Sequence, residues 1–322
     1  MANVNLAIDA KANITAENSL KQSRQLSKPS RTLWGDALHR FRRHTLAMAA
    51  LTLLVLFVLA SIFGPLLYPV DPEALDFAAV FAPPMSPDHI LGTDGLGRDM
   101  LARVLFGGRI SLSVGFVAMA IAVILGSVIG SVAGYFGGKI DQILMRVTDL
   151  FLSLPQLPLI LLTVYLFREP MSKTFGQQQG IFLIVVIMIG GLAWMATARI
   201  VRASFLSLKE KEFVEAAVCI GATHRSIMFK HILPNSFSPI IVAATLEIGN
   251  AIITESTLSF LGVGFPPDTP TWGRLVTDGS EFLQVAAWLA LVPGVLIFLT
   301  VLSINFMGDG LRDALDPRGR RN

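Results

Sequence analysis

The sequence predicts an all-α membrane protein with six transmembrane helices. Of its 322 residues, 53% are hydrophobic and only 15% are charged, and the mean hydropathy is +0.62. This composition is far more apolar than that of an average soluble domain. Several long runs also lack any charged residue, and about 20 apolar residues suffice for a helix to cross the hydrocarbon core of a bilayer.

The N-terminal part combines a polar tail with an amphipathic helix. Residues 1–30 are rich in Asn, Ser, Gln and Lys and lack the apolar core of a cleavable signal peptide, so we expect a disordered, retained tail. From Arg31 to Arg43, Trp34, Leu38 and Phe41 recur at helical spacing beside several arginines. This pattern favours a helix on the lipid surface, and a helix packed on a partner protein is the alternative.

Six apolar segments follow as candidate transmembrane helices. The third contains Pro155 and Pro158, which spanning helices tolerate as kinks. The second carries Gly126, Gly130 and Gly134 on one face, where small residues favour close helix packing. The six predicted spans are Leu46–Tyr68, Ile110–Gly134, Leu150–Phe167, Ile181–Ala198, Ser236–Gly264 and Phe282–Met307.

The charged residues predict the orientation of these helices. Twenty of the 26 Lys and Arg residues fall in segments that are cytoplasmic if both termini are inside, as the positive-inside rule favours. We therefore expect residues 31–108 to hold the interfacial helix, the first span and a long external loop, with a further helix at Gly97–Phe106. A five-helix core at 109–307 and a cytoplasmic tail at 308–322 complete the chain.

The internal loop at 205–235 is too long to be a simple turn. Ser207 and Glu210 have the spacing of a capping box, which predicts a helix that starts there. Gly221 can end this helix in the left-handed conformation. Thr223 can then cap a second helix, which Pro234 should terminate. The loop is thus predicted to be a helix-turn-helix on the cytoplasmic face.

The loop also carries a recognisable motif. Glu215-Ala216-Ala217, then Gly221, then Leu233-Pro234 resembles the EAA loop of permeases of bacterial ATP-binding-cassette (ABC) importers. His231 stands where the general pattern of that family has Ile. Three further stretches resemble the peptide and nickel branch of the family, in particular the C-type subunit of dipeptide and oligopeptide permeases. They are Leu91–Asp99, Gly134–Gly138 with Asp141 and Arg146, and Met307–Pro317.

This resemblance implies a type I ABC importer permease fold and a set of partners. The loop helix would dock on an ATPase subunit, with Glu215 near the contact and Gly221 setting the turn. The partners would be a second homologous permease, two ATP-binding-cassette subunits, an external solute-binding protein and the lipid bilayer of the bacterial inner membrane. Nucleic acid is not expected as a partner, since no basic block lies beside an aromatic pattern.

No residue is expected to perform covalent chemistry. The sequence has no phosphate-binding Gly-x4-Gly-Lys-Ser/Thr loop, so ATP and Mg would be used by the partner subunits and this chain would bind no cofactor. The single Cys219 and the five histidines show no metal-ligand spacing, so no metal site is expected.

The fifth span supplies the candidate translocation pathway. Glu247, Asn250, Thr254 and Thr257 fall within about 80° of arc on a helix, and a charged residue at membrane depth usually faces protein or water. Glu255 lies on the flank of this stripe, where it would meet a peptide amino group or pair with a partner subunit. Trp272 is expected to contact the solute or a binding protein, or to anchor the chain at the membrane interface.

We therefore expect a permease subunit that translocates di- or oligopeptides, driven by partner ATPases. A nickel or glutathione importer of the same family is the nearest alternative. A proton-coupled secondary transporter that titrates Glu247 and Glu255 is a rival of another class, and the sequence does not fix the solute.

Overall fold

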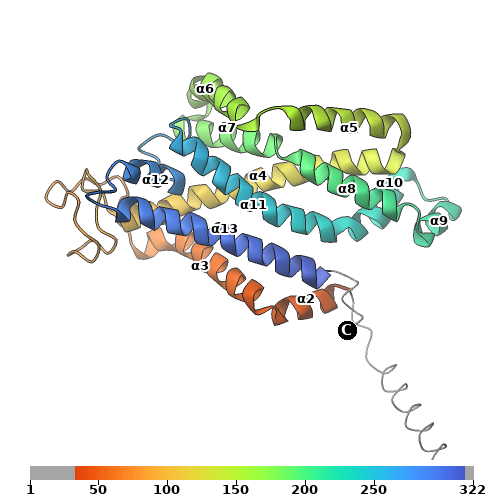
Figure 1. The fold of residues 1–322 in the computed structure, drawn as a ribbon, viewed down its shortest axis with the longest axis horizontal. Coiled ribbons are helices and arrows are strands. Elements are labelled where there is room, and N and C mark those ends of the chain that lie inside the picture. The colour runs from red at the N-terminus through yellow and green to blue at the C-terminus, as the bar shows by residue number, and fades with distance from the viewer. Residues whose placement is uncertain (1–32, 316–322) are drawn as a thin grey trace, which may run out of the picture.

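The computed structural model describes residues 33–315, and this part of the chain folds into an elongated bundle of helices without a β-strand (Figure 1). Five of its helices are long and apolar enough to cross a membrane, and six if one sharply bent pair counts as a single span. The elements are α2 (Leu33–Arg43), α3 (Thr45–Leu67), α4 (Met100–Phe136), α5 (Gly138–Ser153), α6 (Gln156–Phe175), α7 (Gln177–Gly191), α8 (Trp194–Leu208), α9 (Glu212–Cys219), α10 (His224–Ser226), η1 (Ile227–Ile232), η2 (Leu233–Ser236), α11 (Phe237–Phe260), α12 (Trp272–Ser280) and α13 (Trp288–Leu315).

The long helix α4 runs through the bundle and packs against α8 along much of its length. The three glycines of its small-residue face make this packing close. A Cβ atom would lie 2.7 Å from the Trp194 carbonyl oxygen at Gly126, and 2.4 Å from the Ala198 carbonyl oxygen at Gly130. The predicted packing role of this stripe is confirmed.

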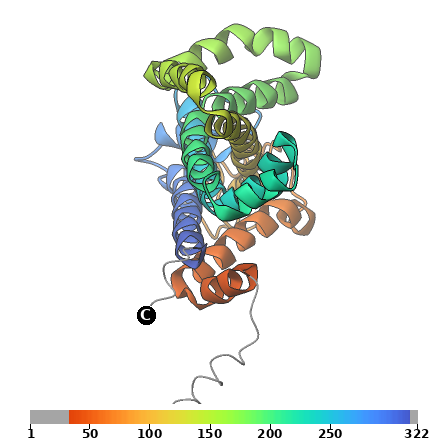
Figure 2. The ribbon, with the colours of Figure 1, turned by 90° about the vertical axis from the view of Figure 1, so that its right-hand side faces the viewer.

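The two ends of the bundle differ. We call one end the α9 end: α2, α9 and the last turns of α13 lie there, and Figure 2 looks onto it. The other is the α12 end, formed by α12 and residues 69–99 (Figure 1). The arrangement brings the predicted cytoplasmic segments within the described chain to one end. The predicted tail at 1–30 and the residues after 315 lie outside the described part, as does the side chain of Trp34.

The third predicted span is not one continuous helix. It breaks between Ser153 and Gln156, and α5 and α6 meet at 81°. Leu154 is extended (ψ 138°), as a residue before proline prefers to be, and Pro155 then precedes α6. The expected kink is therefore a sharp corner. Residues 138–175 supply the sixth span only if the bent pair crosses as one unit.

The predicted helix start at Ser207 is wrong. Ser207 lies near the end of α8, which continues to Leu208, and α9 begins at Glu212 without a side-chain cap. Phe205 is fully buried against the loop helices, so tertiary packing holds this segment in α8. That burial outweighs a local capping signal.

The predicted helix stop at Pro234 is also wrong. From His224 the chain stays helical, passing through a π-helical turn (η1) and a 3₁₀ turn (η2) into α11. Pro234 lies where the π-helical turn passes into the 3₁₀ turn, and this irregular junction accommodates its missing N–H without ending the helix. The Thr223 cap is confirmed, since its hydroxyl accepts a hydrogen bond from the Ser226 amide at 3.3 Å.

Two boundaries at the α12 end also differ from expectation. The helix expected at Gly97–Phe106 is the beginning of α4, with Asp99 as its N-cap accepting from the Ala102 amide at 2.8 Å. The sixth span starts at Trp288 rather than Phe282, since residues 281–287 form turns before α13.

Candidate functional site

The helix α9 is held on the bundle by one apolar face. Val214 and Ala217 are 4% and 3% exposed, and they belong to a cluster with Phe205 of α8 and Ile227 and Ile232 of η1. Leu233 packs on the edge of the same cluster. The burial positions the loop as a rigid part of the α9 end.

The exposed side of this loop carries large apolar side chains among charged ones. Glu215 and Ala216 of the motif are exposed, as is Pro234. Beside them, Val218 is 57%, Ile220 83% and Phe229 55% exposed. An apolar patch at the tip of a polar loop is typical of a protein interaction surface. We call Glu215, Ala216, Val218, Ile220 and Phe229 the loop surface.

Gly221 terminates α9 as predicted. Its φ is +79°, and its amide donates to the Val218 carbonyl oxygen at 2.9 Å while the Ala222 amide donates to the Ala217 carbonyl oxygen at 3.0 Å. These two bonds define a Schellman motif, which requires the left-handed conformation that glycine adopts without strain.

The base of the loop is tied to α4 and α5 by contacts that the sequence did not reveal. The Tyr135 hydroxyl lies 2.7 Å from Nδ1 of His224. Arg202 of α8 forms a two-pronged ion pair with Asp141 of α5, which holds the guanidinium in a fixed plane. The sequence marks Asp141 only through the family resemblance, and no local pattern identifies Arg202 of α8 as its partner.

Three of the predicted pathway residues line one groove. Glu247, Asn250 and Thr254 of α11 share a cavity of about 340 Å³ with residues from the α5–α6 corner and the α7–α8 break. The Gln156 side chain bridges these breaks, since its Nε2 donates to the Leu192 carbonyl oxygen at 2.9 Å. The groove therefore places a carboxylate and an amide where two helices are interrupted.

Glu255 lies elsewhere. It is 1% exposed, and its carboxylate accepts hydrogen bonds from Ser259 at 2.8 Å, Thr271 at 2.9 Å and Ser111 at 3.3 Å. These donors come from α11, from the segment before α12 and from α4. The carboxylate is thus satisfied inside the chain, and it does not line the groove with Glu247.

Trp272 is buried as well, at 2% exposure. Its indole Nε1 donates to the Val104 carbonyl oxygen at 3.0 Å, and its ring meets Phe57 edge to face at 6.5 Å. Neither a solute contact nor an interfacial anchor fits this position. Trp272 instead joins α12 to α4 and α3.

Comparison with known proteins identifies the family. Residues 126–321 match the model of the binding-protein-dependent transport system inner membrane component, and residues 32–84 match the N-terminal TM domain of oligopeptide transport permease C. The chain is 42% identical over 297 residues to the oligopeptide transport system permease protein OppC of Haemophilus influenzae, covering 92% of both chains. It is 38% identical to the dipeptide transport system permease protein DppC of Alkalihalophilus pseudofirmus, covering 88% and 90%.

A glutathione transport system permease protein, GsiD of Pectobacterium atrosepticum, is 37% identical over 90% of this chain and 93% of its own. The fold also matches a solved structure of the MetNI methionine ABC transporter in an inward-facing conformation. That match has a TM-score of 0.52 at 20% identity and covers 67% of this chain and 96% of the other. By these matches of family model and relatives, the chain belongs to the family of binding-protein-dependent transport system inner membrane components, the permease subunits of ABC importers.

Proposed function

We propose that this chain is one of two permease subunits of an importer that carries oligopeptides across the bacterial inner membrane. The observation that supports the proposal best is the groove of Glu247, Asn250 and Thr254. A carboxylate and two neutral polar groups offer partners for the ammonium and amide groups of a peptide, at a depth where isolated polar groups are costly. The relatives OppC and DppC are named for oligopeptide and dipeptide transport, which supports the same cargo.

The loop surface is the proposed docking site for the ATPase. Its exposed apolar side chains, Val218, Ile220 and Phe229, would be covered by a cleft of the partner, with Glu215 at the rim. The chain itself would bind neither ATP nor Mg. The energy would reach the groove as a movement of the loop, which is the logic of alternating access.

The orientation follows from this docking. The α9 end would face the cytoplasm together with both termini, and the α12 end would face the external binding protein. The second permease would pack against the exposed side of α11 and complete the pathway around the groove.

The direct test is uptake by the complex reconstituted in proteoliposomes with its ATPases, second permease and binding protein. Hydrophobic oligopeptides should accumulate only with ATP inside, and Glu247→Gln should reduce uptake by about tenfold or more, since a charged hydrogen bond contributes about 1.5–3 kcal/mol. The matched control is Glu73→Gln, because Glu73 is exposed in the external loop. It should transport normally.

Three outcomes would contradict the proposal. Uptake that persists without ATP and collapses with the proton gradient would indicate a secondary transporter. Accumulation of glutathione in preference to oligopeptides would assign the chain to the sibling function. Full uptake by Glu247→Gln would remove the groove from the pathway.

A further inference from the structure

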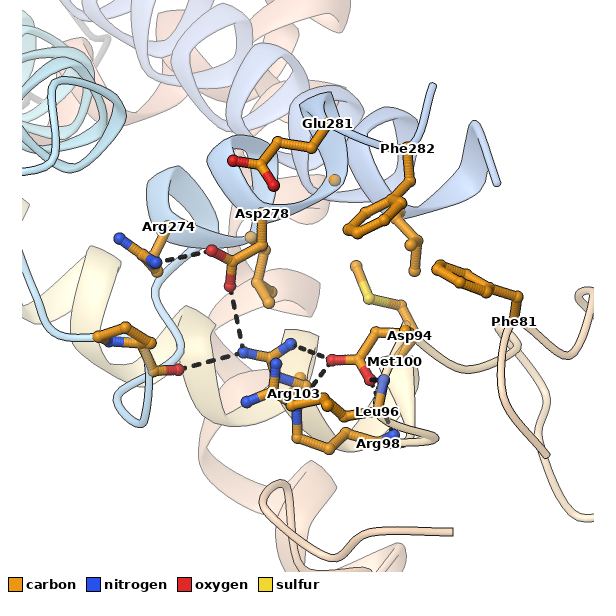
Figure 3. Close-up of a pocket in the computed structure, with 15 residues that line it drawn as sticks. Phe81, Asp94, Leu96, Arg98, Met100, Arg103, Arg274, Asp278, Glu281 and Phe282 are labelled. Carbon is orange, nitrogen blue, oxygen red and sulfur yellow. Dashed lines mark hydrogen bonds and ion pairs between the residues drawn. The ribbon is translucent and has the colours of Figure 1, made fainter. Parts of the chain in front are cut away.

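A second cavity, of about 360 Å³, lies at the α12 end. It is bounded by the start of α4, by residues 94–98 of the long loop and by α12 (Figure 3). One wall is apolar and aromatic: Phe81 and Phe282 meet at 5.0 Å between ring centroids, with Met100 and Leu275 buried beside them. A space of this size lies in the lower range of small-ligand pockets, which span about 300–1,000 Å³.

The other wall carries three guanidinium groups, Arg98, Arg103 and Arg274, and three carboxylates, Asp94, Asp278 and Glu281. Asp94 has no accepting capacity to spare. Its Oδ1 accepts from the Leu96 and Arg98 amides, both at 2.9 Å. Its Oδ2 accepts from Arg98 Nε at 2.7 Å and Arg103 Nη1 at 2.6 Å. Asp278 and Glu281 are therefore the carboxylates left beside the remaining donors.

Arg103 is the central group, and only some of its hydrogen-bond donors have good partners. It is 1% exposed, yet its Nη2 reaches the Pro267 carbonyl oxygen and Asp278 Oδ2 only at 3.5 Å. Its Nε has no hydrogen-bond partner within residues 33–315. A buried donor without an acceptor costs about 1–3 kcal/mol, more when it is charged. The geometry leaves room for one further acceptor beside Arg103.

Arg274 offers donors at the same place. Its Nε forms an ion pair with Asp278 Oδ1 at 2.9 Å, but within the described residues neither this Nε nor the buried Asp278 Oδ2 has a hydrogen-bond partner. Arg103 and Arg274 thus approach different oxygens of Asp278 (Figure 3). Planar guanidinium groups bind carboxylates through paired hydrogen bonds, which a point charge such as lysine does not reproduce.

We propose that this cavity binds the C-terminal residue of a short peptide. The α-carboxylate would take donors from Arg103 and Arg274, and an apolar side chain would lie against Phe81, Phe282 and Met100. The inference rests on the proposed function for the identity of the cargo. The cavity lies at the end opposite α9, so it would hold a peptide delivered from outside before the peptide enters the groove at Glu247.

The test is binding to the assembled transporter in lipid nanodiscs, without ATP and without binding protein. N-acetyl-phenylalanine is the probe, because it presents a C-terminal carboxylate and an apolar side chain but no ammonium group. Its amide differs only at the carboxylate and should bind at least about tenfold more weakly. Octanoate tests whether a fatty acid would serve as well.

The variants separate chemistry from folding. Arg274→Gln should weaken binding of the acid by about tenfold and leave binding of the amide unchanged. Arg103→Gln should abolish binding of the acid. Because Arg103 is buried, thermal unfolding must first show that this variant is folded. Arg225→Gln is the matched control: Arg225 is exposed in α10, at the other end of the bundle, and its loss should leave binding of the acid unchanged.

Equal binding of acid and amide would overturn the inference, as would full binding by a folded Arg274→Gln variant. Tighter binding of octanoate than of N-acetyl-phenylalanine would assign the cavity to fatty acids and overturn the peptide claim. The two proposals fail independently, because Glu247→Gln should leave this binding intact. Peptide uptake without binding refutes only the cavity, and binding without peptide uptake refutes only the proposed cargo.

Discussion

At the scale of single residues, a proline inside a transmembrane helix leaves one carbonyl group without its usual donor. In α3, Pro65 removes the amide that would bond to the Ser61 carbonyl oxygen. Arg109 of α4 supplies the missing donor: its Nε lies 2.7 Å from the Ser61 oxygen and its Nη2 lies 2.6 Å from the Ile62 oxygen. The charge of Arg109 is thereby placed at the α3–α4 contact.

Arg109→Leu should therefore destabilise the protein by about 1–3 kcal/mol, since it leaves the Ser61 carbonyl unpaired. Arg109→Lys keeps the charge but has a single donor group, so its stability should lie between those of the wild type and Arg109→Leu. Thermal unfolding of the purified variants in detergent measures the order. An unchanged midpoint for Arg109→Leu would show that the pairing contributes nothing.

The titration of the Tyr68 phenol gives a prediction about the pH dependence of stability. Burial, followed by its hydrogen bond to Asp99 at 3.0 Å and the negative charge there, raises the pKa of Tyr68 from 10.0 to about 12. Because the folded state favours the neutral phenol, its stabilising effect is complete below pH 10 and is lost as the pH rises towards 12. The chain has three tyrosines, so the tyrosinate absorbance of wild type minus Tyr68→Phe isolates this group. A component that titrates near pH 10 would contradict the assignment.

At the scale of elements, the sequence predicts helices well and their junctions poorly. Spans one and two follow from uncharged length, and the Gly221 turn follows from glycine's conformational freedom. The capping box at Ser207 failed because buried Phe205 keeps that turn in α8. The stop at Pro234 failed because the helix passes this proline through a π-helical and a 3₁₀ turn instead of ending there. Both errors came from long-range packing or from helix variants that local patterns do not encode.

The turn at Gly221 offers a clean test of the loop surface. A Cβ there would meet nothing within 4 Å, so only the φ of +79° opposes a side chain. Gly221→Val should strain the turn by about 1–2 kcal/mol, misplace the loop surface and lower solute-stimulated ATP hydrolysis, with normal membrane insertion. Gly221→Asn, which tolerates this φ, should be milder.

Gly262 is the matched control for that substitution. It has a φ of +78° and equally open surroundings, but it follows α11, at the other end of that helix from the loop. Gly262→Val should carry the same local strain and leave ATPase coupling intact. Equal losses of hydrolysis in both variants would show that strain alone, and not the loop position, is responsible.

At the scale of the whole molecule, the burial of Glu255 and Trp272 could not be read from the chain. Both lie in segments whose composition suits a pathway or an interface. Only the convergence of α4, α11 and the segment before α12 shows that Ser111, Thr271 and Ser259 satisfy Glu255. The groove at Glu247 was foreseen on one wall alone, because the α5–α6 corner that faces it depends on an 81° bend.

The topology can be tested with the single cysteine of the chain. Cys219 is exposed on α9, so, in cells that make this permease without its ATPases, a membrane-impermeant maleimide should label inverted vesicles and leave intact spheroplasts unlabelled. In a Cys219→Ser background, Leu75→Cys, at an exposed position of the long loop (52%), should show the reverse. Labelling of Cys219 from outside would invert the proposed orientation.

The packing of α8 has a mechanical consequence. This helix has 15 residues and is about 22 Å long at a rise of about 1.5 Å per residue. It joins the loop that carries α9 to the α7–α8 break at the groove. A hydrogen-bonded helix resists compression, whereas the chain turns by 81° at the α5–α6 corner that faces its groove end. A displacement of α9 would therefore be transmitted along α8 with little change in the length of that helix. It would move the chain where Gln156 holds the Leu192 carbonyl, beside Glu247.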